Sequence, residues 1–235
     1  MTQPIMPFAT YVSYRRHCVT RGYCDPFIPY VGDRYGDQGS LKLVYCGGAA
    51  RWAESRDKIR DDAEALAHGA ELTRDFVAGG MYSAPFWRLF RQVAAITPGL
   101  ANEVESLMLR RFAWTNLSKT GIVNRSAPPD NDPILRDLDV IQFNHEMDML
   151  RPDLLMCVSG SLLTTTAYTL FDSPGWLQTS TPALTTEKTS ARRTPWGGWL
   201  LWTMHPAYKT RAWFDSIVKD TAMVIATIKN EREAL

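Results

Sequence analysis

The most informative stretch of the chain is Trp199-Leu200-Leu201-Trp202-Thr203-Met204-His205-Pro206. Apolar, β-prone residues lead up to a histidine, and the proline that follows ends a strand and turns the chain. The pattern therefore predicts a buried strand over residues 199–204 with His205 at its carboxyl end. Ligands of open α/β sheets bind at that edge. His205 is thus a candidate site residue, with a buried histidine that caps the strand as the alternative.

Three more strands and a series of helices are predicted on either side of this stretch. The strands are expected over residues 41–46, 111–115 and 153–158, and the helices over 8–19, 56–77, 100–109, 133–150, 161–171 and 212–233, with one more starting near Pro85. Residues 22–40, 121–132 and 176–195 are expected to be loops. Leu135, Leu138, Ile141 and Met149 mark the predicted apolar face of helix 133–150.

Strands that alternate with helices form parallel sheets covered by helices on both faces. We therefore expect an α/β fold in three layers, α/β/α, around a central four-stranded parallel sheet. Residues 1–235 are expected to form a single domain, because 45% hydrophobic residues suffice for one large core.

Charge is balanced over the whole chain but concentrated in one segment. The chain has 26 basic and 25 acidic residues and a net charge of +1, which gives no global signature of nucleic-acid binding. Between residues 182 and 213, however, a single acid, Glu187, accompanies five cations, Lys188, Arg192, Arg193, Lys209 and Arg211. This basic segment predicts a local surface for phosphate groups, with a solvated loop as the alternative.

The sequence contains no apolar run long enough to span a bilayer and no signal-peptide pattern, so we expect a cytoplasmic protein without a membrane partner. Cys46 and Cys157 lie in apolar strand-like runs and are expected to be buried. Cys18 and Cys24 lack a second pair of similar spacing. No metal and no cofactor are therefore predicted. Nothing indicates an obligate protein partner, and a monomer is expected.

Residues that suit ligand binding follow or precede several predicted elements. Gly47-Gly48-Ala49-Ala50 follow the first strand and predict a tight turn where a substrate can approach the backbone, or an ordinary turn. Asn116 follows the second strand, where it either forms a turn or hydrogen-bonds an amide-like edge. Tyr82 and Phe86 supply aromatic rings near a helix start, with core packing as the alternative.

Taken in chain order, the residues at the predicted strand ends resemble those of the uracil-DNA glycosylase superfamily. The resemblance runs from about Leu41 to the C-terminus. It rests on Gly47-Gly48-Ala49-Ala50, on Pro85-Phe86-Trp87, on Thr115-Asn116-Leu117 with Lys119, on Arg151-Pro152-Asp153 before a strand that ends at Gly160, and on His205-Pro206.

The resemblance implies an enzyme that flips a base out of DNA and hydrolyses its N-glycosidic bond, which leaves an abasic site. His205 would donate a hydrogen bond to the base as it leaves as an anion, and Asn116 would read the pyrimidine edge. Phe86 or Tyr82 would stack on the base, and Gly47, Gly48 and Ala49 would line its pocket. DNA would be held by the loop after His205, which enters the minor groove, and by Lys119, Arg192, Arg193, Tyr208, Lys209 and Arg211.

The turn after the first strand departs from the family pattern. The uracil enzymes usually carry an Asp, Glu or Asn there that handles water, then a proline and often an aromatic residue that blocks the pyrimidine 5-position. Residues 47–52 hold neither a carboxylate nor a proline. Glu54 and Asp57 are the nearby acids and the candidates for positioning water, with solvated helix residues as the alternative.

Small residues in this turn would leave room for a C5 substituent, which points to a modified pyrimidine. Some anti-phage relatives in the superfamily excise glucosylated hydroxymethylcytosine, and the sequence is compatible with that substrate. Uracil removal in base-excision repair and a catalytically inactive, nucleic-acid-binding relative are the alternatives. An unrelated α/β hydrolase has less support, because the chain lacks a phosphate-binding glycine loop and a Gly-x-Ser-x-Gly elbow.

Overall fold

A computed structural model of the chain describes residues 8–49, 61–81, 83–121, 132–159, 176, 184–186 and 188–234. The strands in these ranges are β1 (Tyr30–Val31), β2 (Leu43–Ala49), β3 (Phe112–Ser118), β4 (Leu154–Cys157), β5 (Leu184–Thr185), β6 (Thr189–Arg193) and β7 (Trp199–Thr203). The helices are α1 (Phe8–Arg21), α2 (Asp62–Ala78), α3 (Pro85–Ala94), α4 (Glu105–Met108), α5 (Pro133–Leu150) and α8 (Arg211–Glu233).

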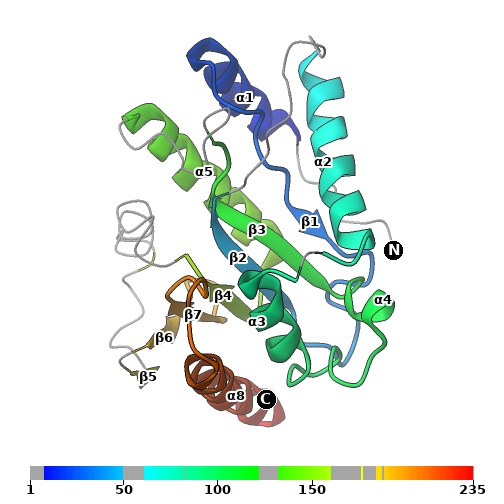
Figure 1. The fold of residues 1–235 in the computed structure, drawn as a ribbon, viewed down its shortest axis with the longest axis vertical. Coiled ribbons are helices and arrows are strands. Elements are labelled where there is room, and N and C mark those ends of the chain that lie inside the picture. Colours follow the sequence, from blue (N-terminus) through cyan, green and yellow to red (C-terminus); the bar gives the residue numbers. More distant parts are fainter. Residues whose placement is uncertain are drawn as a thin grey trace.

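The strands form one seven-stranded mixed sheet in the order β1-β3-β2-β4-β7-β6-β5 (Figure 1). Neighbours among β3, β2, β4 and β7 run parallel, whereas β1, β6 and β5 pair antiparallel at the two edges. The predicted α/β class is confirmed. The four predicted strands lie at the centre and pair in parallel, but the whole sheet is larger and mixed, because short strands in the segments 22–40 and 176–195, which the sequence predicts to be loops, extend it on both sides.

Successive residues of each strand point to opposite faces of the sheet, so the sheet contributes to two apolar cores. One core contains Tyr45, Trp114, Met156 and Leu201 together with Trp87 of α3 and Phe214 of α8. The other contains Val44, Ala113, Leu155 and Leu200 together with Phe143 and Met147 of α5. Helices therefore cover both faces of the sheet in the described part of the chain, as the prediction of three layers required.

The buried face of α5 differs from the predicted one. Ile141 and Met149 are exposed, whereas Asp139, Gln142 and Glu146 are buried. Tyrosines of α1 explain the difference, because Tyr11 donates a hydrogen bond to Glu146 and Tyr14 donates one to Asp139. A polar face can therefore point inward where a neighbouring helix supplies its partners.

Two strands are longer at their carboxyl ends than predicted. β2 continues through Gly47 and Gly48 to Ala49 instead of turning, because β3 pairs with it as far as Ser118. Asn116 lies inside β3, opposite Gly47, and is not a turn residue.

The helix predicted over residues 100–109 is shorter than expected. Only α4 forms a helix within residues 100–109, and the helix predicted over 161–171 lies outside the described residues. Within the described ranges, no helix has the length and apolar character needed to cross a bilayer.

Candidate functional site

The order of the four parallel strands marks one edge of the sheet as the place for a ligand. Their chain order is β2, β3, β4, β7, but in the sheet β2 lies between β3 and β4. The connections that leave β2 and β4 therefore run in opposite directions, and ligands of such sheets bind at the carboxyl ends beside this switch point. Gly47, Asn116, Phe86 and His205 lie on or next to these carboxyl ends.

The side chains of two other residues occupy the space that a Cβ atom on Gly47 would fill. A Cβ on Gly47 would overlap Oδ1 of Asn116 and would lie 3.2 Å from Cε2 of Phe86. The glycine thus lets the asparagine and the phenylalanine approach the backbone of β2. The room that the sequence predicts at Gly47 is already filled by these two side chains.

The side-chain amide of Asn116 has a hydrogen-bond donor without an acceptor in the described part of the chain. The residue is 2% exposed, and its side-chain nitrogen Nδ2 has no hydrogen-bond partner within the described ranges. A buried donor without a partner costs about 1–3 kcal/mol, a cost that a ligand oxygen or nitrogen would remove. Nδ2 of Asn116 is therefore a candidate recognition group.

Phe86 presents a fixed aromatic ring at the same place. It lies in the first turn of α3, where Pro85 begins the helix. Its carbonyl accepts a hydrogen bond of 2.9 Å from the hydroxyl of Tyr45, and the two rings lie 4.7 Å apart. The ring of His205 is nearly parallel to that of Phe86, with 6.4 Å between centroids and 19° between planes. Asn116, Phe86 and His205 therefore converge on one site.

His205 is held as a hydrogen-bond donor. It follows the end of β7, and the backbone N–H of Ala207 donates a hydrogen bond of 3.1 Å to its Nδ1 atom. A ring nitrogen that accepts a hydrogen bond carries no proton, so the neutral imidazole has its hydrogen on Nε2. The side chain is half-buried. The turn at Pro206 thus fixes the tautomer that can donate to an oxygen.

The loop after His205 presents an aromatic residue to solvent. Tyr208 is fully exposed and has a φ of 59°, a left-handed conformation that is unusual for a residue other than glycine and frequent at functional sites. Lys209 and Arg211 follow it, and the side chain of Thr210 caps α8. Tyr208 and these two cations therefore lie on one connection at the carboxyl edge.

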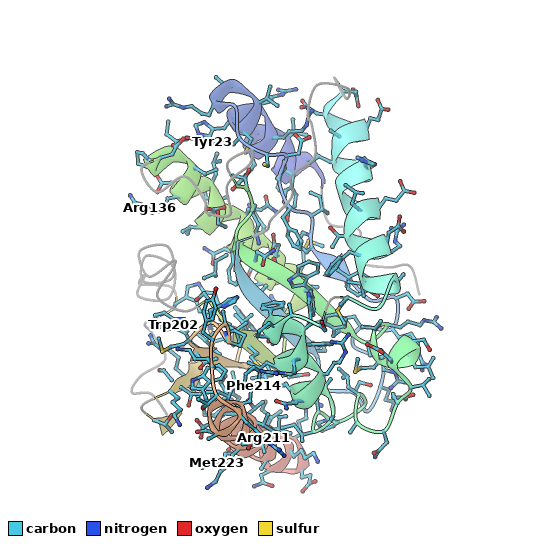
Figure 2. All side chains as sticks on the ribbon, viewed as in Figure 1. Tyr23, Arg136, Trp202, Arg211, Phe214 and Met223 are labelled. Atoms are coloured by element: carbon cyan, nitrogen blue, oxygen red, sulfur yellow. The ribbon has the colours of Figure 1, made fainter. Side chains whose placement is uncertain are left out.

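Arg88 is a cation of this region that the sequence alone does not reveal. It is exposed on α3, and its Cζ atom lies 4.2 Å from the ring centre of Phe214. Figure 2 labels Phe214 near the start of α8. An aromatic residue in the first turn of a much later helix gives no signal for such a contact in the sequence. The pairing of α3 with α8 brings Arg88 close to the start of α8, which also carries Arg211.

The predicted basic segment does not form one surface. Arg192 and Arg193 pair with Leu200 and Trp199, at the amino end of β7. At about 3.3 Å per residue, the Trp199 end lies about 13 Å from the Thr203 end, which leads to His205. Arg193 also forms an ion pair with Glu231 and packs 4.4 Å from the ring centre of Trp199. The prediction that Arg192 and Arg193 share one basic surface with Lys209 and Arg211 is therefore wrong, because antiparallel pairing places them toward the opposite edge of the sheet.

Lys119 is not a DNA contact either. It is fully buried, and its ammonium group forms an ion pair of 2.7 Å with the buried Glu146. A charge enclosed in this way has no access to phosphate. Nothing in the sequence next to Lys119 reveals this, because its partner lies 27 residues later.

The structure places only some of the remaining predicted residues. Tyr82, Glu54 and Asp57 lie outside the described residues. Gly48 is half-buried in β2, and Ala49 is placed as its last residue. Cys46 and Cys157 are both buried, as predicted. Among the residues that the structure describes, no group of three or more His, Cys, Asp or Glu side chains is arranged to hold a metal ion.

Comparison with models of known protein families finds none that matches this chain, and no curated protein matches it.

Proposed function

We propose that the protein is a DNA glycosylase that flips a pyrimidine out of DNA and hydrolyses its N-glycosidic bond. The observation that carries the proposal is the convergence of three groups at one carboxyl edge. These groups are the buried Nδ2 donor of Asn116, the fixed ring of Phe86, and His205 in the tautomer that donates from Nε2. A flipped base needs all three functions, namely a reader for its edge, a ring to stack on, and a donor for the leaving group.

Each group has a defined part in the proposed reaction. Phe86 stacks on the base while Asn116 donates a hydrogen bond to an acceptor on the pyrimidine edge. As the bond between N1 and C1′ breaks, negative charge develops on the base and positive charge on the sugar. Nε2–H of His205 then donates to the base oxygen, where charge accumulates. Water attacks C1′, which yields the free base and an abasic site, and Glu54 or Asp57 is the proposed group that positions this water.

Tyr208, Lys209 and Arg211 are the proposed contacts to the DNA strand. Their loop is joined directly to His205, so binding of the backbone would bring the histidine to the flipped nucleotide. The two cations would contact phosphates, and the exposed ring of Tyr208 would fill space in the minor groove.

We further propose a C5-modified pyrimidine, such as glucosylated hydroxymethylcytosine, as the substrate. Because Asn116 and Phe86 fill the space beside Gly47, room for a C5 substituent has to come from Ala49, the next position of β2 on the same face of the sheet. An alanine carries only a methyl group. Ala49→Tyr should then block a glucosylated base more strongly than uracil. Equal losses on both substrates would assign Ala49 a purely structural part.

The test of the reaction is an abasic-site assay on duplexes that carry uracil, hydroxymethylcytosine or its glucosylated form. Wild-type protein should produce alkali-sensitive sites on at least one of them. His205→Ala should lower turnover by about 100-fold or more while DNA affinity is kept, the loss typical of an oxyanion-hole donor. Tight DNA binding without cleavage of any duplex would favour a catalytically inactive, nucleic-acid-binding protein, and the absence of a carboxylate at the end of β2 would then be its explanation.

A further inference from the structure

Lys119 forms a closed set of hydrogen bonds directly behind Asn116. Its ammonium group donates to Oγ1 of Thr115 and to Oε2 of Glu146, each at 2.7 Å, and to the backbone carbonyl of Asn116. A lysine has three donors, and all three are used here. The ammonium charge is therefore fully compensated, although the side chain is completely buried.

The partners of Lys119 are themselves held by α1 and α5. Oε2 of Glu146 also accepts a 2.6 Å hydrogen bond from Thr115, and Oε1 accepts one from Tyr11 of α1. Asp139, which precedes Glu146 by two helical turns on α5, accepts a 2.8 Å hydrogen bond from the backbone N–H of Lys119. The end of β3 is thus fixed through both side-chain and backbone groups.

Thr115 and Asn116 point to opposite faces of the sheet. Thr115 bonds to Glu146 of α5 on one face, and the amide of Asn116 shares the space beside Gly47 with the ring of Phe86 on the other. Whatever fixes the backbone between these two residues also fixes the direction of the Asn116 amide. The carbonyl that Lys119 holds belongs to Asn116 itself.

Stability alone is a weak explanation for this arrangement. Removing two charges from water is costly, and replacing a buried ion pair by uncharged side chains of similar size is often neutral or stabilising. A buried ion pair does, however, allow a single geometry, and recognition groups require placement to within about 0.5 Å.

We propose that Lys119, together with Glu146, is a positioning residue for Asn116. The ion pair fixes the backbone of β3 so that Nδ2 of Asn116 points at its ligand, and Lys119 itself touches neither the base nor the DNA. The identification of the ligand as a flipped pyrimidine rests on the proposed function. The positioning of the amide does not.

The first experiment needs no activity. The pair Lys119→Met with Glu146→Gln removes both charges, and the new glutamine side chain keeps an oxygen that still accepts from Tyr11. The side-chain amide signal of Asn116, identified in a ¹H–¹⁵N spectrum by its loss in Asn116→Asp, should shift or split in this variant. The matched control is Arg15→Met with Asp62→Asn, which removes another ion pair of a buried cation, at 2.6 Å, between α1 and α2. The control should leave the Asn116 signal in place.

The second experiment measures excision on whichever duplex the wild type cleaves. The double variant should lose about tenfold or more in kcat, with KM changed by about twofold or less, since misplacement of a reacting group lowers turnover. In an Asn116→Ala background the same two substitutions should change kcat by about twofold or less, because their effect passes through that amide. A purely structural part would lower the melting temperature alone.

The outcomes separate the two proposals. An unchanged Asn116 signal in the folded double variant, or the same loss of kcat with and without Asn116, would overturn the positioning role. A changed signal in a protein that cleaves none of the duplexes would support the positioning role and count against the glycosylase. If the double variant does not fold, Thr115→Val takes its place. It should perturb the signal and kcat in the same direction, and wild-type behaviour would overturn the inference.

Discussion

Replacing Gly47 by alanine adds a single methyl group at the point where three parts of the site meet. The new Cβ would overlap Oδ1 of Asn116 and would lie 3.2 Å and 3.4 Å from two ring atoms of Phe86. Phe86 is held by Tyr45 and cannot move easily, so the side-chain amide of Asn116 has to move. The substitution therefore tests whether the amide is packed against the backbone of β2.

The expected loss of stability follows from overpacking. Inserting a methyl group into a filled site destabilises a protein by about 1–3 kcal/mol, which corresponds to a melting temperature lower by roughly 2–12 °C in a chain of this size. The displaced amide should lower excision by about 100-fold, the effect of a misplacement of about 1 Å. Differential scanning calorimetry and single-turnover excision measure the two quantities on the same sample.

Gly69→Ala is the matched control. Its Cβ would lie 3.4 Å from Cγ1 of Ile28 and 3.8 Å from the carbonyl of Pro26, which are ordinary contacts. Because Gly69 lies inside α2, this change should stabilise the protein by about 0.5–1 kcal/mol and leave excision unaltered. If Gly47→Ala behaved like Gly69→Ala, the packing of Asn116 against β2 would be refuted, and the absence of a side chain at position 47 would need another explanation.

Three further predictions concern the loop, the salt dependence and the pH dependence. Tyr208→Gly should relieve the backbone strain at φ 59° and stabilise the free protein slightly while it weakens DNA binding; unchanged affinity in a fluorescence titration would argue against a contact. Lys209→Met with Arg211→Met should reduce the slope of log K against log salt by about 2, whereas Arg192→Met with Arg193→Met, at the opposite edge, should leave it the same. Burial raises the pKa of Asp139 from 3.8 to about 6, so the folded state binds this proton more tightly than the unfolded state. A stabilising contribution of about 3 kcal/mol is then present below about pH 4 and is lost as the pH rises through about 6. The free energy of unfolding, measured with urea, should fall over this pH range in the wild type but not in Asp139→Asn. Parallel pH profiles of the two proteins would contradict the assignment.

Local patterns in the sequence are sufficient for the elements that build the parallel part of the sheet. The run 199–204 and the apolar segments before Gly47 and Gly160 are continuous β-prone stretches, which are typical of strands buried on both faces. The short antiparallel strands escape prediction for a physical reason. β1 and β5 have two residues each, too few for a period, and they exist because a longer neighbouring strand offers free backbone groups.

The candidate site is predictable only where a residue follows a clear strand. His205 follows β7 and Asn116 follows the predicted strand 111–115, which in the structure continues through it to Ser118, and both residues lie close to Phe86. The resemblance assigns Lys119 to the DNA, whereas its burial depends on Glu146, a residue on the inward face of α5. The predicted inward face contains Ile141 and Met149, which are exposed. Tertiary partners from α1 decide both cases, and no local pattern contains them.

The liberated product distinguishes base excision from other ways of hydrolysing DNA. Wild-type protein is incubated with duplexes that carry uracil, hydroxymethylcytosine or glucosylated hydroxymethylcytosine, and the small molecules released are identified by mass spectrometry alongside His205→Ala. We predict a free pyrimidine base in an amount equal to the abasic sites formed, and about 100-fold less of it from the variant. Release of a nucleoside or a nucleotide, or equal release by wild type and His205→Ala, would contradict the proposed reaction and the part assigned to His205.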